Sequence, residues 1–161
     1  MGAEGDLVEV RMARGCRCFG AWLDDDLAGY GWLSTGPEWI GEVELEIRPE
    51  GGEGYIWNCF TLPDHRRQGV LRALLAGIRT SAQADGLRRL WIGSVAIPAE
   101  KAFGQSGFTP ALVFASEVIT GYRWLQVRSA TAADPALVQA AHHVVGVPAG
   151  RSLRVSHPRR H

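Results

Sequence analysis

The feature that most constrains the fold is a change in hydrophobic periodicity inside residues 55–95. Residues 55–62 form an uninterrupted apolar and aromatic run that ends at Pro63, which is typical of a central strand covered on both faces. Beyond it, apolar residues recur at helical spacing as far as Gly86, on the face made by Val70, Leu71, Leu74, Leu75 and Ile78. Residues 90–95 are again mostly apolar. The pattern predicts a strand–helix–strand unit whose strands pair in parallel.

The segment before this unit has the pattern of antiparallel strands. Residues 16–23 and 28–34 are two strand-like runs on either side of three aspartates, which predicts a hairpin. In residues 42–47, valine, leucine and isoleucine alternate with Glu42, Glu44 and Glu46. This period of two predicts a half-buried strand.

The segment after the unit repeats the alternation of helix and strand. Residues 99–106 predict a short helix, and residues 110–119 and 122–127 predict an antiparallel pair. Asp134 followed by proline predicts the capped start of a helix that runs to about residue 145. Residues 151–161 are rich in arginine and predict a frayed basic tail. The expected fold class is therefore α/β (α+β), with a mixed, mostly antiparallel twisted sheet and flanking helices.

The composition narrows the class of protein. With 161 residues, 46% of them hydrophobic, the chain has enough apolar surface for one buried core, which excludes an intrinsically disordered protein. We expect neither a membrane span nor a secretory signal, because no apolar run is long enough. Three cysteines are few and odd in number, which favours a reducing, cytoplasmic location.

The net charge of zero conceals an uneven distribution. Residues 1–64 hold 13 acidic and 4 basic residues, and residues 65–161 hold 4 acidic and 13 basic ones. One interpretation is two solvated faces that neutralise each other. The other is a basic half that holds an anionic ligand and an acidic half that faces a cationic one. Binding of nucleic acid is a third interpretation, and we do not favour it.

Residues 62–72 join the predicted central strand to the predicted helix and carry the strongest functional pattern. The start of a helix has unpaired backbone N–H groups and binds anions, and Gly69 lets the backbone approach a phosphate closely. Arg66, Arg67 and Arg72 add positive charge, so a diphosphate is the expected ligand. The competing interpretation is that the arginines only solvate the helix start. The glycine patterns of a P-loop and of a dinucleotide-binding fold are missing.

The order strand, proline, then Arg66-x-x-Gly69-x-Leu71 resembles the acetyl-CoA motif of the GNAT (GCN5-related) N-acetyltransferase superfamily, [QR]-x-x-G-x-[GA]. Leu71 departs from the motif at its last position. The resemblance implies that backbone N–H groups of the loop hold the pyrophosphate of acetyl-CoA, and that the preceding strand pairs with the pantetheine arm. The positions implied for the pyrophosphate are Arg66, Arg67, Gln68, Gly69, Val70, Leu71 and Arg72. Those implied for the pantetheine are Phe60, Thr61 and Leu62.

A second stretch resembles the same superfamily. Residues 91–95, followed by the helix pattern of residues 99–108, are similar to the strand and A-x-x-x-Y-x-x-x-G-F helix of its second motif. The resemblance covers roughly residues 16–128. Phe103 stands where many members have a tyrosine that protonates the departing thiolate, so it can pack against the cofactor but cannot donate a proton. The asparagine often found after the strand is also missing.

The resemblance implies an acyl-CoA-dependent N-acyltransferase, which transfers acetyl from acetyl-CoA directly to an amine in a ternary complex. The alternative is a degenerate acyl-CoA-binding or interaction module without efficient turnover. Residues 1–128 are expected to form the GNAT-like domain, without most of the usual first strand and two helices, and residues 129–161 a C-terminal helix and tail. The acceptor is expected to be a small-molecule or peptide amine, and a partner subunit in a homodimer is one way to complete the acceptor wall.

No catalytic residue stands out. Candidates for the base are Glu42, Glu44 and Glu46, which equally fit a solvated strand face, or a water held by Asn58. An amide N–H exposed between residues 58 and 62, where the strand splays, is the candidate for polarising the thioester carbonyl. Cys59 fits an inert core residue better than a nucleophile. We expect no metal site, because three cysteines at these spacings do not make a zinc centre.

Overall fold

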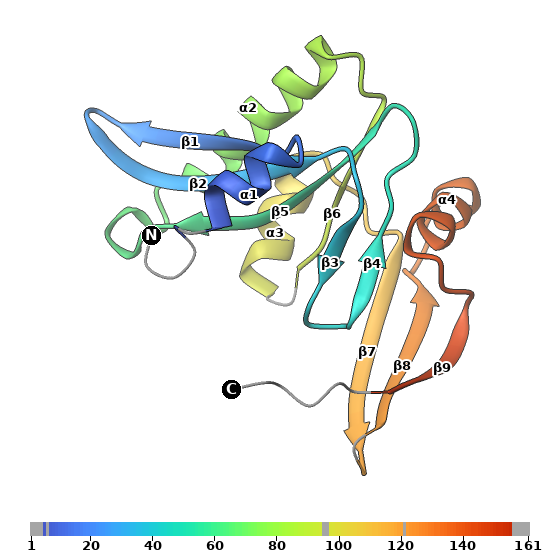
Figure 1. Ribbon diagram of the computed structural model, residues 1–161. Helices are drawn as coiled ribbons and strands as arrows, with labels where there is room; N and C mark the ends of the chain where they lie inside the picture. The colour runs from blue at the N-terminus through green and yellow to red at the C-terminus, as the bar shows by residue number, and fades with distance from the viewer. Residues whose placement is uncertain (1–4, 6, 95–96, 121, 156–161) are drawn as a thin grey trace. The chain divides into compact units, whose positions relative to one another are not determined.

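The computed structural model describes residues 5, 7–94, 97–120 and 122–155 (Figure 1). The chain forms two compact units, which are described separately here. Unit 1 comprises Met1–Glu38 and Pro49–Phe108, and unit 2 comprises Trp39–Arg48 and Thr109–His161. Within the described ranges, every helix is too short or too polar to cross a lipid bilayer.

Unit 1 is built on a four-stranded sheet in the order β1-β2-β5-β6. The strands are β1 (Arg17–Leu23), β2 (Asp26–Ser34), β5 (Glu53–Thr61) and β6 (Arg89–Ile92). Neighbours pair antiparallel except β5 and β6, which pair in parallel. The predicted hairpin, central strand and parallel strand–helix–strand unit are therefore confirmed, as is the mixed, mostly antiparallel sheet with flanking helices.

One face of this sheet is covered by α2 (Val70–Ala84). The apolar stripe of α2 meets the inward side chains of β2 and β5, because residues at helical spacing share one face. The buried core consists of Leu33, Ile56, Leu74, Leu75, Ile78 and Ala82. Helix α3 (Ile97–Gln105) adds Phe103, whose half-buried ring packs against the same core.

The opposite face of the sheet carries α1 (Val8–Ala13), which is drawn in front of β2 and β5 in Figure 1. Successive residues of a strand point to opposite faces, so Trp32 points away from the α2 side that Leu33 faces. The guanidinium carbon of Arg11 lies 5.2 Å from the centroid of the Trp32 ring and 4.5 Å from that of Trp57. Arg11 is itself only 8% exposed.

Unit 2 contains a three-stranded antiparallel sheet in the order β7-β8-β9. Its strands are β7 (Leu112–Ile119), β8 (Tyr122–Ser129) and β9 (Gly150–Val155), so the predicted antiparallel pair is confirmed. The predicted frayed tail is wrong for residues 151–155, and residues 156–161 lie outside the described residues. A polar segment forms an edge strand here because the pairing uses backbone groups of β8 and not apolar side chains.

Helix α4 (Pro135–Val145) also belongs to unit 2 and begins where the sequence predicts. The side chain of Asp134 caps it, with Oδ1 accepting from the N–H groups of Ala136 at 2.7 Å and Leu137 at 3.3 Å. It ends at Gly146, which has a left-handed backbone with φ of 62°. Capping at both ends satisfies backbone groups that the helix itself leaves unpaired.

The predicted half-buried strand over residues 42–47 is wrong in its first part. The structure has a short β3 (Glu38–Ile40), a turn, and then β4 (Leu45–Ile47), which together form a two-stranded sheet. Glu44 has φ of 50°, which a strand does not allow. Its carboxylate lies 3.1 Å from Nε of Arg123, so a turn at this point brings the charge to a partner on β8.

The close approach of β2 to β5 gives a test of the fold. A Cβ atom at Gly29 would lie 2.7 Å from the carbonyl oxygen of Phe60, so Gly29→Ala must displace backbone. We expect it to lower the free energy of unfolding by about 2 kcal/mol, measured by urea denaturation. The matched control is Gly77→Ala on α2, where a Cβ meets nothing within 4 Å and should stabilise by about 0.5–1 kcal/mol. Equal effects of the two substitutions would contradict the β2–β5 register.

Candidate functional site

Strand β5 has a different partner on each edge, and the two pairings end at different residues. Pairing with β6 ends at Ile56 opposite Ile92, whereas pairing with β2 continues to Thr61 opposite Gly29. The register with β2 also shifts near Asn58, whose φ of 46° marks a bulge. Residues 57–61 of β5 therefore continue past the end of their parallel neighbour and present one edge that β6 does not cover.

Hydrogen bonds at the end of β5 show which backbone groups face that edge. The N–H of Leu62 donates to the carbonyl oxygen of Ala28 at 2.9 Å, on the β2 side. Backbone groups of successive strand residues point to opposite edges, so the N–H and C=O of Thr61 point away from β2. The side chain of Arg66 reaches the same edge, where Nε donates to the Thr61 carbonyl at 3.4 Å. Of the three residues predicted to pair with an extended ligand, Thr61 has the suitable backbone orientation.

The chain then turns into α2 through a loop with two left-handed residues. A 3-10 turn (η2, Pro63–His65) follows β5, Arg67 has φ of 64°, and Gly69 has φ of 83° at the N-cap of α2. No side chain caps this helix. The first N–H groups of α2 thus have no partner within the helix, and left-handed turns of this kind make concave anion-binding sites. Glycine is needed at residue 69 because of its backbone angle.

The side chains of the loop divide between solvent and core. Those of Arg66, Arg67 and Arg72 are exposed, and Gln68 Nε2 donates to the Asp64 carbonyl at 3.0 Å. Val70 is buried, and the side chain of Leu71 packs against the α2 core. The bulky residue in the last motif position therefore adds to the core. Its side chain does not fill the loop, and the positive charges remain around the helix start.

Phe103 lies at the position where many members of the resembling superfamily have a tyrosine hydroxyl. Its ring centroid lies 6.3 Å from that of Phe108, and the ring packs against the core under α2. An aromatic ring held between core side chains supplies packing and no proton. Any protonation of a leaving thiolate must therefore come from another group or from water.

The three glutamates considered as bases belong to unit 2, whereas the loop and β5 belong to unit 1. Glu44 pairs with Arg123, and Glu46 pairs with Arg48. Both carboxylates are therefore engaged by arginine side chains, as expected of structural ion pairs. Within the residues described, no cluster of three or more histidine, cysteine, aspartate or glutamate side chains has a metal-binding arrangement.

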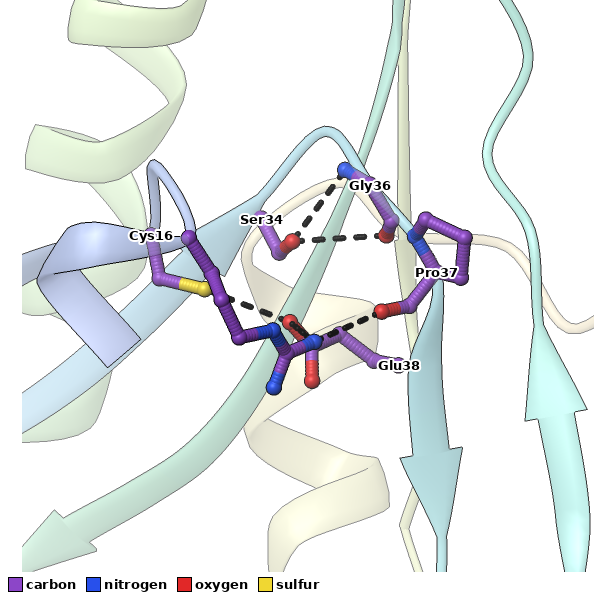
Figure 2. A network of polar contacts seen from close by, with 6 residues as sticks. Cys16, Ser34, Gly36, Pro37 and Glu38 are labelled. Carbon is purple, nitrogen blue, oxygen red and sulfur yellow. Dashed lines mark hydrogen bonds and ion pairs between the residues drawn. The ribbon is translucent and has the colours of Figure 1, made fainter. Parts of the chain in front are cut away.

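A buried polar network that no sequence pattern predicts lies at the end of β2 (Figure 2). The carboxylate of Glu38, which is 5% exposed, accepts hydrogen bonds from Cys16 Sγ at 3.2 Å and from Arg14 Nη2 at 3.0 Å. The same Nη2 donates to the Pro37 carbonyl at 2.8 Å. These residues lie 22 to 24 positions apart in sequence, without a local motif, so only the fold brings them together. The network anchors the chain where it leaves β2.

Cys59 lies on β5 beside the bulge but faces the α2 core. Burial raises the pKa of its thiol to about 12. A thiol in that environment stays protonated at neutral pH and is a poor nucleophile. The raised pKa and the packing of Cys59 against the core agree with the expectation that it is an unreactive core residue.

The raised pKa gives a test. At pH 8 about one Cys59 thiol in ten thousand is ionised, so we expect iodoacetamide to leave it unmodified in the native protein. After unfolding in urea, the same thiol should react at the rate of a free cysteine. Peptide mass spectrometry measures both states. Rapid labelling of Cys59 in the folded protein would show that it is reactive after all.

Comparison with known proteins identifies the family and supports the fold. The model of the acetyltransferase (GNAT) family matches residues 4–108. No curated protein matches the chain. Three of the similar solved structures are acetyltransferases. A protein of Agrobacterium tumefaciens str. C58 assigned as an acetyltransferase has 15% identity and a TM-score of 0.53, over 74% of this chain and 80% of its own.

The other two have TM-scores of 0.50. A Bacillus subtilis acetyltransferase in complex with CoA has 18% identity over 73% of this chain and 65% of its own. The ribosomal-protein-alanine N-acetyltransferase of Brucella melitensis biovar Abortus 2308 has 21% identity over 74% of this chain and 79% of its own. At sequence identities this low, the similarity to these three structures shows a shared fold and nothing more specific. The match of the family model to residues 4–108 establishes that the chain belongs to the GNAT family of acetyltransferases.

Proposed function

We propose that this protein is an N-acetyltransferase that transfers acetyl from acetyl-CoA directly to an amine in a ternary complex. The observation that carries the proposal is the continuity of two binding features in unit 1. The edge of β5 beyond β6, at residues 57–61, leads through the loop that carries Arg66 and Arg67 into the start of α2 at Gly69. A ligand with an extended arm and a diphosphate at its end would match this site, because the arm could lie along the strand edge and the anionic diphosphate beside the arginines.

The loop would hold the diphosphate of CoA. Helix α2 has 15 residues, so its N-terminal N–H groups and dipole favour an anion. The exposed guanidinium groups of Arg66, Arg67 and Arg72 add charge-assisted hydrogen bonds, while the backbone at Gln68–Leu71 supplies N–H groups. The Bacillus subtilis acetyltransferase of similar fold was solved with CoA, which supports this ligand.

The uncovered edge of β5 would hold the pantetheine arm, which has amide groups that can extend a sheet. The N–H and C=O of Thr61 point to this edge, and Phe60 and Leu62 flank it. A backbone N–H near the bulge at Asn58 would donate to the thioester carbonyl oxygen as negative charge develops there. In this arrangement the acyl carbon lies beside residues 57–61.

The reaction itself needs few protein groups. The amine nitrogen forms a bond to the acyl carbon and loses a proton, the C–S bond breaks, and the CoA thiolate takes up a proton. Phe103 cannot supply that proton, so water or another group does. At high pH the acceptor amine is already unprotonated in solution and can bind in that form. We therefore assign no catalytic base.

The same substitution favours a second candidate function. Because the Phe103 ring is packed on Phe108 and carries no hydroxyl, the protein would bind acyl-CoA without efficient turnover. Both functions place the cofactor on residues 60–72. We further propose that residues 1–128 form the functional domain and that the acceptor is a small-molecule or peptide amine. We also propose that the protein acts in the cytoplasm. A homodimer would complete the wall of the acceptor site.

A charge placed at the loop tests the cofactor site. Gly69→Asp puts a carboxylate beside the expected diphosphate, and we expect it to weaken acetyl-CoA binding at least tenfold by calorimetry. The control is Gly86→Asp, at the opposite end of α2, which also has a left-handed backbone with φ of 77° and open space around its Cβ. Gly86→Asp should retain the affinity within twofold. Loss of affinity in both variants, or in neither, would refute the loop assignment.

Turnover separates the two candidate functions. The wild-type protein should release CoA thiol from acetyl-CoA when amines are added, and Gly69→Asp should lower kcat/KM at least tenfold because it no longer holds the cofactor. The measurement is thiol release with a colorimetric reagent across a panel of primary amines. Tight binding of acetyl-CoA with no amine-dependent release would favour the non-catalytic binding module.

A further inference from the structure

The sheet face opposite α2 carries a group of four aromatic side chains, here called the aromatic face: Tyr30, Trp32, Trp57 and Phe60. The rings of Trp32 and Trp57 stack with centroids 6.0 Å apart, and those of Tyr30 and Phe60 lie 5.8 Å apart. Gly31, between Tyr30 and Trp32, faces Leu74 of α2, which places its two neighbours on the other face. Phe60 is 40% exposed, so the aromatic face reaches solvent at that end.

Trp57 contributes an indole N–H for which the described part of the chain offers no acceptor. Its Nε1 is buried, and it has no hydrogen-bond partner among the described residues. A buried donor without a partner destabilises a fold, so such a group calls for an explanation. One explanation is a bound ligand whose oxygen accepts a hydrogen bond from this N–H.

The position of Trp57 connects this donor to the proposed reaction. Trp57 is the first residue of β5 beyond its last pair with β6 and immediately precedes the bulge at Asn58. The same short segment provides the uncovered edge proposed for the pantetheine arm. An acceptor amine bound on the aromatic face is therefore next to the acyl group.

Helix α1 contacts the aromatic face through the side chain of Arg11. Arg11 is the buried residue of this six-residue helix and stacks over Trp32 and Trp57, whereas Val10 and Met12 are more than half exposed. Short segments with little buried apolar surface open at a lower free-energy cost than the core of a domain, so a ligand on this face requires Arg11 to move aside. The charge of Arg11 also disfavours a polycationic acceptor on this face.

Resting on the proposed N-acetyltransferase function, we propose that the aromatic face is the acceptor subsite and that it takes α-amino carbonyl compounds. The indole N–H of Trp57 donates to the carbonyl oxygen next to the amine-bearing carbon, and the side chain of the acceptor packs on Phe60. Free amino-acid amides and peptide N-termini share this chemistry. Simple alkylamines lack the oxygen, so they lose that hydrogen bond.

Indole N–H resonances test the contact without any turnover. In 15N-labelled protein saturated with CoA, the indole cross-peak lost in Trp57→Phe identifies Trp57. Adding phenylalaninamide or a phenylalanyl dipeptide should shift this peak, and phenethylamine, which has the same ring and amine but no carbonyl, should not. A shift with either carbonyl compound supports the subsite and tells whether free or peptide acceptors are preferred. No shift with either, or an equal shift with phenethylamine, overturns it.

Affinity measurements provide the second readout. By calorimetry, the wild type should bind phenylalaninamide about tenfold more tightly than phenethylamine, and Trp57→Phe should remove most of that ratio, because it keeps the ring and loses the donor. The control is Trp22→Phe, since Trp22 is 62% exposed on β1, and it should keep the wild-type ratio. An unchanged ratio in Trp57→Phe overturns the proposal. Failure of the proposed function appears separately, as absence of acetyl transfer or of acetyl-CoA binding.

Discussion

The unequal pairing of β5 is the constraint on which the rest of unit 1 depends. Its β2 edge is bonded to the end of the strand, whereas its β6 edge is bonded only as far as Ile56. The packing of α2 on the core around Ile56 and Leu75 fixes where the chain must turn after β5. Because β5 leads directly into that helix, the edge of β5 beyond β6 and the first N–H groups of α2 lie next to each other along the chain.

The few residues between β5 and α2 combine positive charge with left-handed backbone angles. Arg67 and Gly69 both adopt left-handed backbone angles, and the rest of unit 1 holds them there. The side chains of Arg66, Arg67 and Arg72 are exposed here, so burial does not account for their position. Membership of the GNAT family fits this arrangement, and the departures at Leu71 and Phe103 are both accounted for by packing into the core.

Much of this could be predicted from local patterns. The apolar run ending at Pro63, the helical stripe of α2 and the cap at Asp134 are short-range features, and the structure has each of them. The strand expected over residues 42–47 fails because alternation over so few residues is outweighed by the turn that pairs Glu44 with β8. Strand β9 was missed because edge pairing leaves no hydrophobic pattern in the sequence.

The sequence alone determined the β1–β2 hairpin, the strand–helix–strand unit of β5, α2 and β6, the start of α4 and the family, since each depends on spacing within a few residues. Only the tertiary structure decided that β5 continues past β6, that the carboxylate of Glu38 is buried against Cys16, and that the indole N–H of Trp57 finds no acceptor among the described residues. The physical reason is that pairing length, burial and hydrogen-bond satisfaction are properties of distant segments in contact. These properties cannot be predicted from the order of residue types along the chain.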